Sequence, residues 1–250
     1  MPTPQAPVRR RLLLVTPEAE LSGNFPRGFE IAAKGAKTGS AEHRALLFAV
    51  ATVASQAVER CLAPSARGSA EVGLLCVRRW ARDDASLREV REARNVVFES
   101  AADAEKDTVG SLSHALQSEN TDPLSKHQLE IATRYVALGV HHCHAAVAFC
   151  LDAVTDGRQA LEVAGEAAGA KAYTQTGLGA ARSETLRTSA TEQARWECER
   201  VASSRHHSEA GIALQRLHEY LGVHWKNHVD AQRLYFEEFL GWVFADNSAS

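Results

Sequence analysis

The stretch from Arg78 to Val90 constrains the fold more than any other, because it contains a helix end, a tight break and a new helix start. Ser86 is followed three residues later by Glu89, a capping box in which each side chain can satisfy a backbone N–H that the first helical turn leaves without a partner. Apolar residues then recur at helical spacing, with charged residues between them. The stretch therefore predicts a helix over 86–107 and, more generally, helices joined by short turns.

The first half of the chain carries further helix signals. An apolar stripe predicts a helix over 42–62, which Pro64 and Gly68 are expected to end. A second helix is expected at about 69–82. Gly110 is expected to interrupt any continuation of the helix that starts at Ser86.

The second half begins with a strong start signal, because Asp122 stands where an N-cap belongs and Pro123 follows at the first helical position. The helix expected from there to about 154 is apolar on every side near its middle, which is typical of a central helix. The Gly- and Ala-rich residues 158–182 are open to two interpretations, close helix packing or a loop. A charged helix is expected over 183–204. The aromatic end, 208–245, is expected to form two helices divided at Gly222.

Residues 1–40 contain five prolines and four glycines, which break any helical period. We therefore expect an irregular N-terminal arm over 1–40 and a single helical domain over 41–250. A chain of 250 residues that is 45% hydrophobic and 24% charged can bury a sizeable core. The predicted fold class is all-α, an irregular helical bundle of about six to eight helices.

The net charge and the composition of the chain favour some partners over others. A net charge of -3 gives no global attraction to a phosphate backbone, so no nucleic acid is expected as a partner. No apolar run is long enough to span a bilayer, which takes about 20 residues, so no membrane partner is expected. The five cysteines contain no C-x-x-C pair, which suits a reducing, cytoplasmic location and small core residues.

Histidines form the one pattern that suggests a metal. His141 and His144 lie in the predicted central helix, and His224 and His228 lie one turn apart near the C-terminus. If these groups converged, they would suit zinc or another divalent metal. Neither a Glu-x-x-His pair nor a His-Glu-x-x-His motif accompanies them. The alternative is that they are packed or surface residues, and then no cofactor is implied.

A mixed-charge segment that contains Trp196 suggests a protein partner instead. Tryptophan and arginine are frequent anchors of interfaces, so Arg195 and Trp196 are candidate partner-binding residues, together with Trp225 and Trp242 in the aromatic end. The alternative is a solvated helix face held by ion pairs between residues four apart.

Three segments stand beside Ala-rich helices: His43-Arg44-Ala45-Leu46, Val77-Arg78-Arg79-Trp80-Ala81-Arg82 and Ser86-x-x-Glu89-Val90-Arg91. Through these segments, residues 43–105 resemble a group of all-helical immunity proteins of bacterial polymorphic toxin systems. An Ala- and His-containing helix at 141–148 extends the likeness. The resemblance implies a non-enzymatic protein that neutralises a toxin by direct binding, with no catalytic residues to carry over.

The chain contains no phosphate-binding loop, dinucleotide fingerprint or nucleophile elbow. We therefore expect a non-enzymatic bundle that binds another protein, with an immunity or regulatory role. Two alternatives stay open. One is a metal-dependent enzyme or sensor that uses the histidines, and the other is a scaffold that forms a homo-oligomer through its aromatic end.

Overall fold

A computed structural model describes residues 36–117, 126–188 and 190–230. Within these ranges it leaves out the side chains of 41–42, 102–107, 109, 111, 113–117, 185, 214–216 and 218–230. The described residues form seven α-helices and one 3-10 turn, with no strand among them, which confirms the predicted all-α class. The elements are α4 (Ala41–Glu59), α5 (Pro64–Ala81), α6 (Leu87–Gln117), α7 (Lys126–Asp152), η1 (Gly157–Gln159), α8 (Ala160–Arg182), α9 (Thr185–Thr188) and α10 (Thr191–Asp230).

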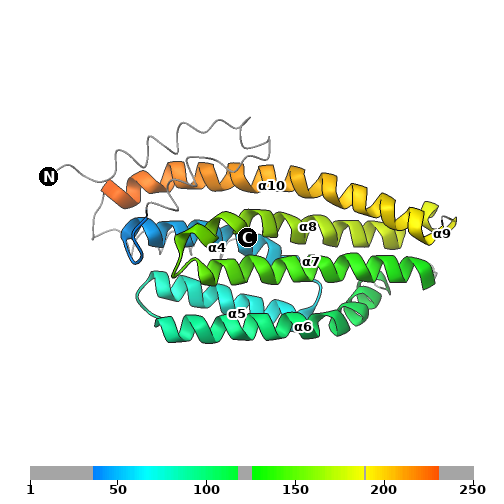
Figure 1. Ribbon diagram of the computed structural model, residues 1–250, viewed down its shortest axis with the longest axis horizontal. Coiled ribbons are helices and arrows are strands. Elements are labelled where there is room, and N and C mark those ends of the chain that lie inside the picture. The colour runs from blue at the N-terminus through cyan, green and yellow to red at the C-terminus, as the bar shows by residue number, and fades with distance from the viewer. Residues whose placement is uncertain (1–35, 118–125, 189, 231–250) are drawn as a thin grey trace.

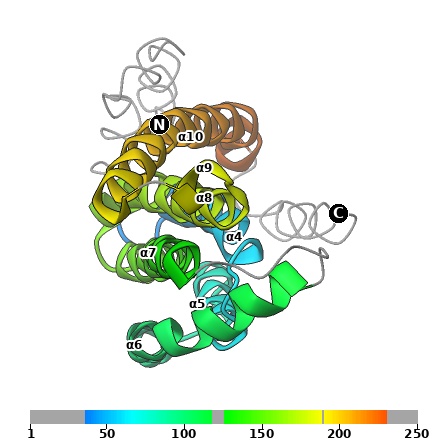
Figure 2. The ribbon, with the colours of Figure 1, turned by 90° about the vertical axis from the view of Figure 1, so that its right-hand side faces the viewer.

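The helices lie roughly parallel to one long axis and stack in layers (Figure 1). Viewed from the end, α10 covers α8 and α4, which lie on α7 and α5, and α6 closes the opposite side (Figure 2). The most extensive interface joins α7 and α8, and α7 also contacts α4, α5 and α6. The all-round apolar character of this segment correctly predicts a central helix.

The helix starts that the sequence marks are present. The Ser86 hydroxyl accepts a hydrogen bond from the Glu89 N–H at 3.2 Å, and a Glu89 carboxylate oxygen accepts one from the Ser86 N–H at 2.7 Å. These bonds form the predicted capping box, and the hydrogen bonds that the Ser86 N–H and the Ser86 hydroxyl donate to the Glu89 carboxylate lower its pKa. The break before it places Asp83 in the left-handed region at φ 66°, where its carboxylate pairs with Arg44.

Three predicted boundaries are wrong. The first helix, α4, ends before Pro64 as predicted, but the second begins at Pro64 and not at about 69, because the missing N–H of proline costs nothing at the first helical position. Gly110 does not interrupt α6, which continues to Gln117. Gly222 does not divide the C-terminal region, since α10 runs unbroken to Asp230. A helical glycine costs only about 1 kcal/mol relative to alanine, and packing of these long helices on their neighbours outweighs it.

The Gly- and Ala-rich segment is helix α8, and its small residues permit a close approach to α7. A Cβ added at Gly139 would lie 2.9 Å from the backbone nitrogen of Thr174, and one at Gly177 would lie 2.8 Å from the carbonyl oxygen of Ala132. No larger residue fits at either position without separating the backbones. The packing interpretation of 158–182 is therefore correct.

Some predictions fall outside the described residues. These include Asp122 and Pro123, the arm as far as residue 35, and the segment 231–250 with Trp242. The five cysteines are free and buried, as expected of small core residues. None of the described helices combines the length and the apolar character that crossing a membrane requires.

Candidate partner-binding groove along α7

A groove of about 920 Å³ lies on the outer face of the first half of α7. Most of its lining comes from α7 at helical spacing, and α6 and α10 each contribute one residue. We call it the α7 groove and define it by Ala101, Lys126, Leu129, Glu130, Thr133, Arg134, Ala137, Leu138, Val140, His141 and Arg195. Ala137 gives the lining a small, apolar side chain, which leaves room above it.

The groove exists because α6 leaves the outer face of α7 halfway along it. Ala101 of α6 still lines the groove, but the second half of α6 veers away, as the end view shows (Figure 2). There Leu112 is fully buried and packs with Ala132 and Val136, on another side of α7. Within the part of the chain that the structure describes, the first half of α7 is thus covered on its inner sides and uncovered on its outer one.

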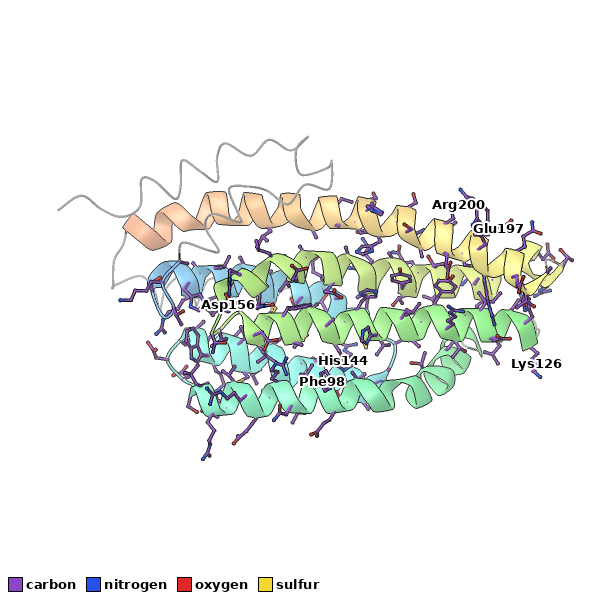
Figure 3. The ribbon with its side chains drawn as sticks, in the orientation of Figure 1. Phe98, Lys126, His144, Asp156, Glu197 and Arg200 are labelled. Carbon is purple, nitrogen blue, oxygen red and sulfur yellow. The ribbon has the colours of Figure 1, made fainter. Side chains whose placement is uncertain are left out.

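Two strongly exposed aromatic side chains come from α6 and α10, the helices that each contribute a lining residue to the groove. Phe98 is 69% exposed and stands one turn before Ala101 on the same face of α6. Trp196 is 62% exposed and follows Arg195 in α10, with the Arg200 guanidinium 6.0 Å from its ring centroid. Phe98 lies midway along α6 and Lys126 at the far end of α7 (Figure 3). Large exposed aromatics beside an apolar floor are typical of interface anchors.

Ion pairs form the wall of the groove on the α10 side. The Arg195 guanidinium donates to the Glu130 carboxylate, and Arg134 lies 3.9 Å from Glu199. Beneath them the Tyr135 hydroxyl donates to the Arg195 carbonyl at 3.0 Å. Burial raises the pKa of Tyr135 to about 12, so this hydroxyl stays a donor at neutral pH. These bonds fix the register of α10 against α7.

The partner-binding prediction therefore has a mixed outcome. Arg195 lines the groove, and Trp196 next to it is exposed but is not part of the lining, so partner binding by either residue stays a prediction. The side chain of Trp225 and the whole of Trp242 lie outside the described residues. Sequence analysis missed Phe98, although the sequence contains a signal for it. Phe98 is a large apolar residue that lies one position away from Val97, which is buried and belongs to the apolar stripe of α6.

The structure does not bring His141 and His144 together. His141 is exposed and lines the groove, whereas His144 is 3% exposed between α5, α6 and α7. The His144 ring has partners at both nitrogens: Nδ1 lies 3.0 Å from the Val140 carbonyl oxygen and Nε2 lies 3.2 Å from the Ser100 hydroxyl. Burial lowers the pKa of His144.

The side chains of His224 and His228 lie outside the described residues, although their backbone belongs to α10. Among the described residues, no three His, Cys, Asp or Glu side chains are grouped as metal ligands would be.

A second histidine group, which sequence analysis did not single out, joins α7, α8 and α10. His142 lies 2.7 Å from the Glu166 carboxylate and stacks on Tyr173 with ring centroids 4.9 Å apart. His206 reaches the Gly165 carbonyl oxygen at 3.0 Å, and burial lowers its pKa. Each ring is held by partners from neighbouring helices, so the group serves to pack the three helices.

Comparisons with protein families, curated proteins and solved structures found no match for this chain. The functional argument therefore rests on the geometry of the chain itself.

Proposed function

We propose that this protein is a non-enzymatic helical bundle that binds another protein by seating a helical segment of the partner in the α7 groove. One observation carries the proposal: among the described residues no helix covers the outer face of the first half of α7, and the flanking helices α6 and α10 carry two strongly exposed aromatic residues, Phe98 and Trp196. In a bundle, such a face is complementary to one more helix.

The dimensions support a helix as the occupant. The α7 residues that line the groove run from Lys126 to His141, a length of about 22 Å at about 1.5 Å per residue. A helix of about four turns covers that length. Ala137 at the centre of the floor lets a leucine-sized side chain of the partner sit between the ridges of α7.

The proposed biological role is immunity or regulation by direct binding, in a cytoplasmic protein. Five free, buried cysteines support a reducing location, because thiols there stay unpaired. Direct binding requires no catalytic group, and the groove presents anchors and ion pairs instead.

The test is affinity capture of the tagged full-length chain from the cells that produce it, with three variants in parallel. Ala137→Arg fills the floor of the groove, and Phe98→Ala with Trp196→Ala removes the aromatic anchors. Leu75→Ala is the matched control, because Leu75 is 55% exposed on α5 and does not line the groove.

We expect a stoichiometric partner that is retained by wild type and Leu75→Ala and lost in both groove variants. Capture that is equal in all variants contradicts the proposal. If the retained partner is a second copy of the chain, light scattering will show a dimer, and the protein is then a self-associating scaffold.

A further inference from the structure

The charges that border the α7 groove are unequal. Its lining contains three cationic side chains, Lys126, Arg134 and Arg195, and one carboxylate, Glu130. Glu130 is engaged by Arg195. Among the side chains that the structure describes there, positive charge therefore remains in excess even when Glu199 is counted.

The excess positive charge lies on Lys126 and Arg134, which are available for contact with a partner. Arg134 and Glu199 are 52% and 61% exposed at 3.9 Å, a long and solvated pair of little energetic worth. Lys126 forms no ion pair with any residue in the described part of the chain.

We infer that the segment which occupies the α7 groove is an acidic amphipathic helix of about four turns. Its apolar stripe lies on Leu129, Ala137 and Leu138, and its carboxylates flank that stripe toward Lys126 and Arg134. The inference rests on the proposed function and specifies the chemistry of the partner. Charge of this kind acts chiefly on association rate and on the choice of partner.

The experiment is selection from a displayed library of amphipathic helices against the full-length protein. The apolar positions of the library are fixed as leucine at helical spacing, and the flanking positions are randomised among acidic, basic and neutral residues. The same library is selected against two variants. Lys126→Glu with Arg134→Glu reverses the charge of the groove, and Arg67→Glu with Arg88→Glu makes the same change in net charge on α5 and α6, away from the groove.

We expect wild type and the Arg67/Arg88 control to enrich Asp and Glu, and the reversed groove to enrich Lys and Arg. A selected acidic peptide should bind wild type about tenfold more tightly than its Gln-substituted form at low salt. That difference should vanish near about 1 M salt, where the Debye length is about 3 Å.

The outcomes test two claims separately: that the groove binds a helix, and that this helix is acidic. Helices that bind wild type but not Ala137→Arg, with no preference in charge, leave the groove as a helix-binding site and overturn the acidic assignment. Selection that yields no binder, or only binders that Ala137→Arg retains, overturns the groove as a docking site as well.

Discussion

The two halves of α7 belong to one helix and have opposite environments on their outer face. His141 and His144 stand one turn apart, yet His141 is exposed in the groove and His144 is almost fully buried. Covalent position does not explain the contrast. α6 covers the outer face beside His144, where Ser100 meets the ring, and leaves it at Ala101. A bundle can therefore build a binding face by withdrawing one helix, without changing the helix that supplies the floor.

The largest expected effect lies on the covered side of α7. Gly139→Ala should lower the free energy of unfolding by about 3 kcal/mol, because the added methyl meets the backbone of Thr174 and Ala170 on α8. Ala137→Leu, two residues away on the groove floor, should cost less than about 0.5 kcal/mol. Urea unfolding of both variants tests the contrast, and equal costs would contradict it. Gly179→Ala is the control in open space and should be neutral or stabilising.

The second-largest expected effect is a difference in the free energy of unfolding between His144 and His141 variants. His144→Ala should cost about 2 kcal/mol, because it removes a buried ring and its contacts with the Ser69 and Ser100 hydroxyls. His141→Ala should stay within about 0.5 kcal/mol, since that ring is exposed. Thermal unfolding measures both. A large cost for His141 would mean that the groove is closed in solution.

Acid should act on the covered regions and spare the groove. Burial lowers the pKa of His43, His144 and His206, so each is neutral in the folded state and binds a proton more readily when unfolded. Their stabilisation is complete above the unfolded-state pKa of about 6.5 and is lost as the pH falls through that value toward the lower folded-state values.

Urea midpoints measured between about pH 7.5 and about pH 5.5 should therefore fall with pH. His206→Gln keeps a donor for the Gly165 carbonyl and should flatten the dependence. Midpoints that rise as the pH falls would contradict the assignment of neutral, buried rings.

The smallest expected effect concerns the aromatic residues beside the groove. Phe98→Ala and Trp196→Ala should each change the free energy of unfolding by less than about 0.5 kcal/mol, because both side chains are mostly in water. Val97→Ala, adjacent to Phe98 but fully buried, should cost about 2 kcal/mol. Differential scanning calorimetry compares the three. If Phe98 proves as costly as Val97, it packs in the bundle and cannot serve as an anchor.

Most of the fold followed from local sequence. Ser86 and Glu89 predict a helix start because a capping box needs only residues three apart, and the apolar stripe at 42–62 predicts α4 because its spacing is helical. The glycines misled the prediction of boundaries. At Gly110 and Gly222 the penalty is small, and packing of the long helix on its neighbours decides the outcome.

The sequence by itself determined that the chain is helical, that α7 is central and that Arg195 and Trp196 are candidate anchors. Only the tertiary structure decided that Arg195 lines a groove, that Phe98 is exposed, and that His141 and His144 lie in different environments. Helical spacing specifies which residues share a face. Which faces are covered depends on where neighbouring helices, here α6 after Ala101, pass in space.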